Sequence, residues 1–189
     1  MSHKEQWIFC NKIKEKFPES FCNVKVLDIG SFDVNGNEKF LFENCEFYGL
    51  DLMEGLGVDI VCPAQDYDAP DESYNTIISC ECWEHNPFYK ESIKNAVRML
   101  KKGGLFLFTC ATTGRAVHGI KSLENESKQK YNNWKTMPNV IRHEWDNEYY
   151  KNLTESDIRE CIDIDKIFSQ YSFEVEETHH DLYFWGIKK

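Results

Sequence analysis

The chain has 189 residues, and 22 basic against 32 acidic side chains give it a formal net charge of −10. This length suits one domain, and an aromatic share of 14% is too high for a disordered acidic chain. The negative charge argues against broad binding to nucleic acid or to an anionic membrane face. No apolar run approaches the roughly 20 residues of a membrane span, and the start lacks a signal-peptide pattern. We therefore expect a single cytoplasmic domain over residues 1–189.

The eight cysteines are scattered, mostly inside apolar runs, which is typical of reduced thiols that act as small buried residues. No C-x-x-C pair occurs, and Cys80 and Cys82 are one residue too close for a zinc knuckle. Four acidic residues in the expected acceptor region could hold a divalent ion, namely Glu81, Glu84, Glu144 and Asp146. No ligand spacing singles one of them out, so we assign no metal ligands and expect no disulfide framework, and the metal requirement stays open.

Apolar periodicity predicts alternating helices and strands in the first 110 residues. Residues 4–17 have apolar side chains at helical spacing, and Pro18 ends this helix. Two more helices are expected, over 35–43 and over 88–100, the latter ended by the pair Gly103-Gly104. Five strands are expected over 24–29, 47–52, 58–62, 74–80 and 105–110. Short apolar strands that alternate with helices or connections indicate a parallel sheet in a doubly wound α/β fold.

The alternation stops at about residue 111. No hydrophobic period is sustained over 111–153, and a segment of this length without regular structure is commonly functional. We therefore interpret 111–153 as a substrate-side insert in the domain.

Regular structure resumes at Thr154, which opens a helix through a capping box to Asp157 that continues to Phe168. Two extended segments, 172–178 and 182–188, predict an antiparallel hairpin, with His179 and His180 in a solvated turn. The expected fold is thus a Rossmann-like α/β fold. Its sheet is seven-stranded, mostly parallel, and ends in a C-terminal antiparallel hairpin.

The loop after the first strand is the expected ligand loop, because open α/β sheets bind ligands at the carboxyl ends of their strands. Gly30 permits close approach of a ligand to the backbone there. Asp51 ends the second strand, where a carboxylate can accept hydrogen bonds from both hydroxyls of a ribose. A dinucleotide site needs G-x-G-x-x-G, and Phe32 occupies its second glycine position. The loop therefore favours a ribose-bearing ligand without phosphates over a nicotinamide dinucleotide.

Five runs together carry a family resemblance: VLDIGSFDVNG, YGLDL, GVDIV, TIISCECWEH and MLKKGGLFLFT. They occur in this order within residues 24–112 and resemble the small class I S-adenosylmethionine-dependent methyltransferases of the type 11 kind. The resemblance implies methyl transfer as the activity and S-adenosyl-L-methionine as the cofactor. Phe32 departs from the family, in which many members have a glycine, and this concerns the shape of the methionine pocket.

The resemblance also implies cofactor contacts. The methionine end would be lined by Asp28, Gly30 and Ser31, and the methyl donor would lie beside Cys80 and Glu81. Asp51 would bind the ribose, Leu52 would pack on the adenine, and the adenine edge would contact Gln65 and Asp66. Asp28 as a strand-end cap and Asp66 as a solvated turn residue are the alternatives, since Asp favours both places.

Three histidines are candidates for the base that a hydroxyl acceptor requires. His85 follows the fourth strand, His118 lies beside a glycine-flanked arginine in the insert, and His143 lies further along it. A structural hydrogen-bonding role is the alternative for His85. Acceptor binding is assigned to Arg115, Trp145 and Tyr149.

Local charge adds to the acceptor prediction. Between Thr112 and Arg142 the sequence contains six basic and two acidic residues, which gives this segment a local charge of +4. Such an insert would attract a small phosphorylated acceptor, although a solvated lid is the alternative. Residues 145–153 resemble the segment after the insert in methyltransferases of sugar and cell-surface glycan synthesis. We therefore expect O-methylation of a sugar or nucleotide-linked sugar. Other small O or N acceptors, a non-catalytic binding module and a homo-oligomer stay open.

Overall fold

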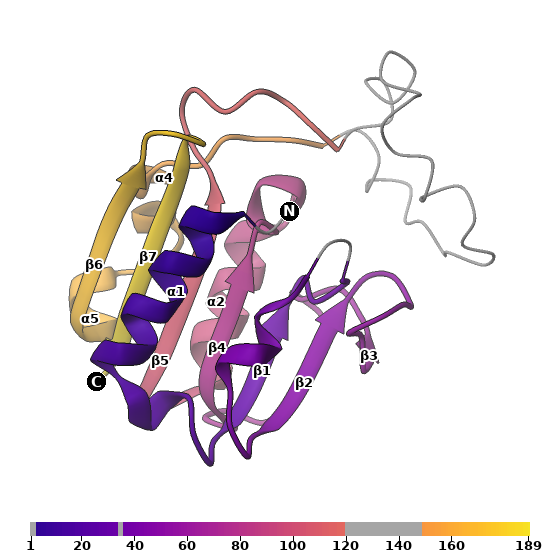
Figure 1. The fold of residues 1–189 in the computed structure, drawn as a ribbon, viewed down its shortest axis with the longest axis vertical. Helices are drawn as coiled ribbons and strands as arrows, with labels where there is room; N and C mark the ends of the chain where they lie inside the picture. Colours follow the sequence, from indigo (N-terminus) through magenta and orange to yellow (C-terminus); the bar gives the residue numbers. More distant parts are fainter. Residues whose placement is uncertain (1–2, 34–35, 120–148) are drawn as a thin grey trace.

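A computed structural model describes residues 3–33, 36–119 and 149–189. Within these residues seven strands form one mixed sheet (Figure 1). They are β1 (Lys25–Ile29), β2 (Glu46–Asp51), β3 (Ile60–Val61), β4 (Tyr74–Cys80), β5 (Leu100–Ala111), β6 (Phe168–Glu176) and β7 (Asp181–Lys188). Their order in the sheet is β3-β2-β1-β4-β5-β7-β6. The first five pair in parallel, whereas β7 is antiparallel to both β5 and β6. The predicted seven-stranded, doubly wound fold with its C-terminal hairpin is confirmed.

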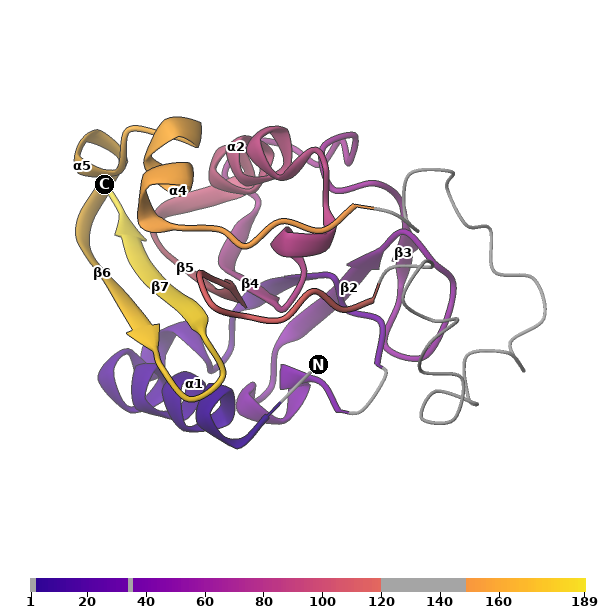
Figure 2. The same ribbon diagram turned by 90° about the horizontal axis from the view of Figure 1, so that it is seen from above.

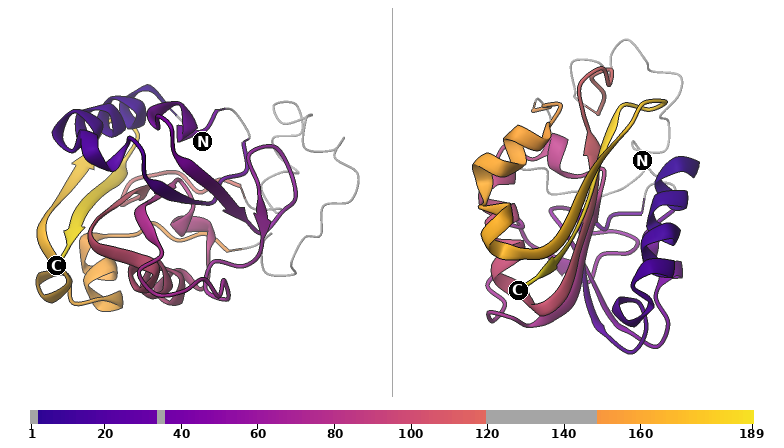
Figure 3. Two further views of the ribbon diagram at one scale, coloured as in Figure 1. Left: turned by 90° about the horizontal axis from the view of Figure 1, so that it is seen from below. Right: turned by 90° about the vertical axis from the view of Figure 1, so that its left-hand side faces the viewer.

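Helices cover both faces of the sheet (Figures 2 and 3). One face carries α1 (Lys4–Lys16), with the short 3-10 helices η1 (Pro18–Ser20) and η2 (Glu38–Leu41) near it. The other carries α2 (Tyr89–Met99), α4 (Glu155–Cys161) and α5 (Ile164–Ile167). The apolar side chains divide accordingly, since Phe9 and Ile13 pack with one face and Ile93 and Ile158 with the other. Within the described residues, no helix has both the length and the apolar character needed to cross a membrane.

The predicted helix over 88–100 is confirmed as α2, but the helix predicted over 35–43 and the role of Gly103-Gly104 as a helix end were wrong. In place of a helix over 35–43 the described residues contain only the one-turn η2, because Gly36 has φ of +110° and donates its amide to Asp33 (2.6 Å). Helix α2 ends at Met99, ahead of the glycine pair that was expected to end it. Those glycines lie inside β5, which already pairs with β4 at Leu100.

The second half shows one confirmed feature and two differences. The capping box at Thr154 is present, with Asp157 accepting from the Thr154 amide (2.9 Å). The helix that follows is divided into α4 and α5, because Ile162 is extended and Asp163 caps the start of α5. The turn at His179 is also less solvated than expected. Its imidazole is half-buried and lies 3.2 Å from Glu176.

Candidate active site

The predicted cofactor residues lie at the point where the strand order reverses. Strands β1 and β4 are neighbours, but the chain leaves β1 towards β2 on one side and leaves β4 towards β5 on the other. Figure 1 shows the carboxyl ends of these strands at one edge of the sheet. A crevice at such an edge is the general ligand position of open α/β sheets.

Gly30 lies where the loop that follows β1 contacts the loop that follows β4. Its φ is +84°, and a Cβ added there would lie 2.6 Å from Cβ of Cys82. The amides of Gly30 and Ser31 both donate to the carbonyl of Leu50, at 2.8 and 3.2 Å. A side chain at position 30 would therefore meet both backbone strain and a steric clash, and only glycine fits.

Buried polar groups surround this loop. Asp28 is 2% exposed, and burial raises its pKa well above the usual range, as do the charges of Glu38 and Asp51. The Ser31 hydroxyl is buried and has no hydrogen-bond partner among the described residues. Glu38 accepts from the Gln6 amide nitrogen at 3.3 Å. Because buried polar groups are nearly always satisfied, the Ser31 hydroxyl indicates a place for a ligand or a water molecule.

Asp51 is held in a fixed orientation at the end of β2. One carboxylate oxygen accepts from the amide of Phe32 and the other from that of Met53, both at 3.1 Å. The Phe32 ring packs on Gly55, where an added Cβ would collide with it. The bulky side chain that departs from the family pattern is thus accommodated by a glycine in the β2–β3 connection. Leu52, the predicted adenine contact, follows and is half-buried.

Three other predicted cofactor residues, Gln65, Asp66 and Cys80, contact other parts of the fold. Gln65 is half-buried and accepts from the Ser92 hydroxyl at 3.2 Å, whereas Asp66 is exposed in the same turn. The Cys80 side chain packs against the apolar cluster that contains Cys10 of α1, and burial raises the pKa of its thiol well above the usual range. Their contacts with a cofactor stay predictions.

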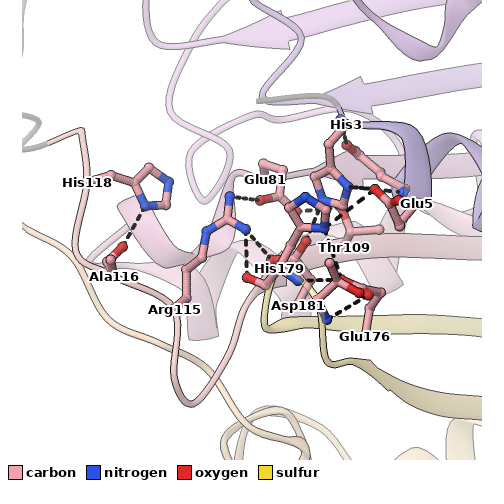
Figure 4. A network of polar contacts seen from close by, with 12 residues as sticks. His3, Glu5, Glu81, Thr109, Arg115, Ala116, His118, Glu176, His179 and Asp181 are labelled. Carbon is pink, nitrogen blue, oxygen red and sulfur yellow. Dashed lines mark hydrogen bonds and ion pairs between the residues drawn. The ribbon is translucent and has the colours of Figure 1, made fainter.

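Glu81 connects the predicted cofactor side with the predicted acceptor side. It follows β4 with φ of +54°, a conformation that non-glycine residues rarely adopt outside functional or strained sites. Its carboxylate accepts from the Thr109 hydroxyl at 2.9 Å and lies 3.9 Å from the Arg115 guanidinium (Figure 4). Burial raises the pKa of Glu81, and so does the charge of Asp181.

Arg115, predicted to bind the acceptor, belongs to this charge network. It donates to the His179 carbonyl at 2.7 Å and lies 3.5 Å from the fully buried Asp181, which in turn lies 2.5 Å from the His3 imidazole (Figure 4). Sequence reasoning missed His3 and Asp181, because they come from opposite ends of the chain and no local pattern connects them.

Two of the three candidate bases lie together. The rings of His85 and His118 meet edge to face with centroids 5.0 Å apart, and Tyr150 contacts both. His118 Nδ1 lies 3.0 Å from the Ala116 carbonyl. Burial lowers the pKa of His85 to about 3, with help from His118, and burial also lowers that of His118. Both imidazoles are therefore neutral near pH 7.

Glu84 lies beside these rings. It belongs to η3 (Trp83–His85), is fully buried, and neither carboxylate oxygen has a hydrogen-bond partner among the described residues. Burial raises its pKa to about 8, to which the charge of Glu81 contributes. One ligand atom each from Glu84, His85 and His118 lies within 4.8 Å of the other two. In the sequence Glu84 is only one of several acidic residues of the expected acceptor region, because burial does not show in a local pattern.

The remaining acceptor-side predictions are only partly covered. Tyr149 is half-buried, and burial, together with Tyr89, raises its pKa. His143 and Trp145 lie outside the described residues, as does most of the basic insert.

Comparison with known proteins fits this geometry. Residues 27–108 match the family model described as a methyltransferase domain. This part of the chain is similar to methyltransferase domains. The predicted resemblance is confirmed, since the matched residues include the loop after β1, Asp51 and the end of β4. Comparison with curated proteins finds no match.

Solved structures share the fold of the methyltransferase domain at low identity. Phosphoethanolamine N-methyltransferase 2 of Haemonchus contortus, in complex with phosphomonomethylethanolamine and S-adenosylhomocysteine, matches with a TM-score of 0.60 and 14% identity over 96% of this chain and 52% of that one. A Burkholderia thailandensis 1,6-didemethyltoxoflavin-N1-methyltransferase matches with a TM-score of 0.57 and 13% identity. The match covers 100% of this chain and 92% of that one. The chain thus spans about half the length of the Haemonchus enzyme. At these identities the likeness concerns the fold.

Proposed function

We propose that the methyltransferase domain binds S-adenosyl-L-methionine and methylates a hydroxyl of a small acceptor, a sugar or nucleotide-linked sugar. The bound cofactor supplies an electrophilic methyl group on a sulfonium. The family match supports the cofactor, and both solved relatives named above were crystallised with S-adenosylhomocysteine. The observation that carries the proposal is the meeting of the Gly30 loop, Asp51 and the His85–His118 pair at one sheet edge.

The residues around the Gly30 loop fit the parts of this cofactor. A buried carboxylate such as Asp28 is stabilised by an opposite charge, which the ammonium of a methionine moiety provides. The Ser31 hydroxyl, without a partner among the described residues, offers a hydrogen bond beside it. Asp51 has both oxygens oriented by backbone amides, and a carboxylate at this strand end can accept hydrogen bonds from ribose hydroxyls.

The histidine pair fits a hydroxyl acceptor. A carbonyl oxygen can only accept, so the contact with Ala116 fixes the proton of His118 on Nδ1 and leaves a lone pair on Nε2. Nε2 can therefore take up the proton that a hydroxyl loses on methylation. The surrounding residues then act mainly by positioning, which provides much of the rate in such a displacement.

A small amine is a second acceptor class. The buried carboxylates Glu81 and Glu84 would pair with an ammonium group, and the Haemonchus relative is named as a phosphoethanolamine N-methyltransferase. In that case the carboxylates supply the binding, and the ammonium loses one proton to a neutral imidazole of His85 or His118 before its nitrogen attacks the methyl group.

Asp51→Ala tests the cofactor half. We expect S-adenosylhomocysteine to bind the unchanged protein and to bind the variant at least about 100 times more weakly, because two hydrogen bonds to a charged group are lost. Titration calorimetry measures both dissociation constants. Asp68→Ala, an exposed residue of the β3–β4 connection, is the matched control and should bind normally. Equal affinities for Asp51→Ala and the unchanged protein would show that Asp51 does not hold the ribose.

His118→Ala and His85→Ala test the acceptor half, in a screen of nucleotide sugars and small amines with product analysis by mass spectrometry. Loss of a general base lowers kcat by about 100-fold or more for a hydroxyl acceptor. His180→Asn, in the exposed turn before β7, should keep full turnover. Full turnover in both alanine variants would exclude either residue as the base. Binding of S-adenosylhomocysteine without turnover on any acceptor would instead identify a non-catalytic module.

A further inference from the structure

We propose that Glu84, His85 and His118 form a binding site for a divalent transition-metal ion of the Zn²⁺ type on the acceptor side of the domain. One nitrogen or oxygen of each residue lies within 4.8 Å of the other two. Two imidazoles and one carboxylate are a known ligand set of catalytic zinc sites, which keep a further position for water or substrate. These residues have no recognisable ligand spacing in the sequence, because two are adjacent and the third lies 33 positions further on.

Glu84 provides the strongest observation. Its side chain is fully buried in η3, and neither carboxylate oxygen has a hydrogen-bond partner among the described residues. A buried carboxylate is costly unless it is protonated, paired with a charge or bound to a metal. The Lys151 amide donates to the main-chain carbonyl of Glu84 and not to its carboxylate.

His118 has the orientation of a metal ligand. Its Nδ1–H donates to the Ala116 carbonyl at 3.0 Å, and its Nε2 is buried with no partner in the part of the chain that the structure describes. Metal-binding histidines typically donate their other ring nitrogen to a carbonyl or carboxylate in this way, which fixes the tautomer and turns the lone pair towards the ion. The His85 ring packs edge to face against the His118 ring, with centroids 5.0 Å apart.

The cationic and donor groups nearby are occupied elsewhere. The Arg115 guanidinium is bound to the His179 carbonyl and lies beside Asp181, and the Lys151 ammonium lies 2.6 Å from Asp157. The Tyr150 hydroxyl points to the Ala116 carbonyl at 3.4 Å. Both Glu84 oxygens and His118 Nε2 thus lie close to His85 without a side-chain partner among the described residues, and a metal cation would bind all three groups.

A second group of potential metal ligands, His3, Glu81 and Asp181, is a weaker candidate for a metal site. The His3 imidazole is already bonded to Asp181 at 2.5 Å. Arg115 lies 3.9 Å from Glu81 and 3.5 Å from Asp181, so a resident cation balances these carboxylates. The metal is therefore assigned to Glu84 and the two histidines.

An ion at this position deepens the proposed function, on which this one consequence rests. With the ion bound, His118 would serve as a ligand in place of the base. The ion would lower the pKa of an acceptor hydroxyl in its open position, and the hydroxyl proton would pass to solvent water. Metal binding itself requires neither cofactor nor acceptor.

The test is calorimetric titration of Zn²⁺ into the chelator-treated full chain, without cofactor. We expect one ion per chain, and binding at least about 100-fold weaker in Glu84→Gln and in His118→Ala. His180→Asn is the matched control and should bind Zn²⁺ like the unchanged protein. Because the chain has eight cysteines, Co²⁺ is titrated in parallel. Nitrogen and oxygen ligation gives visible bands without the intense near-ultraviolet absorption of cobalt–thiolate bonds.

Absence of stoichiometric Zn²⁺ binding would overturn the proposal, as would unchanged affinity in Glu84→Gln and His118→Ala, or a thiolate spectrum with Co²⁺. If Glu84→Gln does not fold, His118→Ala carries the test, since His118 lies on a loop. Binding of S-adenosylhomocysteine is measured on the same samples. A protein that binds Zn²⁺ but not S-adenosylhomocysteine would contradict the proposed function and leave the metal site standing.

Discussion

At the scale of single residues, the molecule is marked by a buried charge network between its two ends. His3 and Arg115 supply positive groups, and Glu81 and Asp181 supply buried carboxylates. Buried carboxylates are tolerated when opposite charges and hydrogen bonds accompany them. The network therefore holds the start of α1 against the start of β7, beside the residue at which β4 turns into the candidate site.

His3 makes this network sensitive to pH. Burial lowers the pKa of the imidazole, but the hydrogen bond and charge of Asp181 outweigh burial and raise the pKa above its ordinary 6.5. A group whose pKa is higher in the folded state stabilises that state fully below its unfolded value, and this contribution is lost as the pH rises through the folded value. We expect the free energy of unfolding to fall between about pH 6 and 8.

His3→Gln isolates this contribution, since glutamine keeps a donor but does not titrate. We expect the variant to be about 2 kcal/mol less stable near pH 6, where hydrogen bonds to charged groups are worth about 1.5–3 kcal/mol. The difference should shrink towards pH 8 in urea unfolding followed by circular dichroism. His180→Asn should keep the slope of the unchanged protein. A constant difference across this range would show that His3 is not charged in the folded state.

At the scale of elements, α4 shows how a short sequence signal specifies a local structure. Thr154 accepts from the Asp157 amide, and the Asp157 carboxylate accepts from the Thr154 amide and hydroxyl. Both groups of the cap lie within four residues, so the sequence alone predicts the start of this helix. Its end depends on packing, because the apolar pattern continues through the break before α5.

Thr154→Ala removes this cap. We expect a loss of about 1 kcal/mol in the free energy of unfolding, which is typical for a helix N-cap. In a chain of this length the midpoint of thermal unfolding should fall by about 2–4 °C. Ser156→Ala, an exposed position in the first turn of α4, is the matched control and should change stability little. Equal melting temperatures for Thr154→Ala and the control would mean that the capping box does not stabilise α4.

At the scale of the whole molecule, the order of strands decides where the candidate site lies. Gly30 follows β1 and Asp51 ends β2, and the parallel pairing of β1 with β2 and β4 brings both to one edge with Glu81. This grouping was predictable, because the carboxyl ends of parallel strands share an edge. The meeting of His85 with His118 was not, since the loop after β5 has no periodic pattern that predicts its path.

Local patterns in the amino-acid sequence were enough to predict the α/β class, the seven strands, the C-terminal hairpin and the methyltransferase resemblance. These features depend on the spacing of apolar residues and on short motifs, which act within a few positions of each other. The burial of Glu84 beside two imidazoles, with no hydrogen-bond partner for its carboxylate among the described residues, became visible only in three dimensions, as did the contact of His3 with Asp181. Burial and long-range contacts arise when distant segments pack together, and no local pattern encodes them.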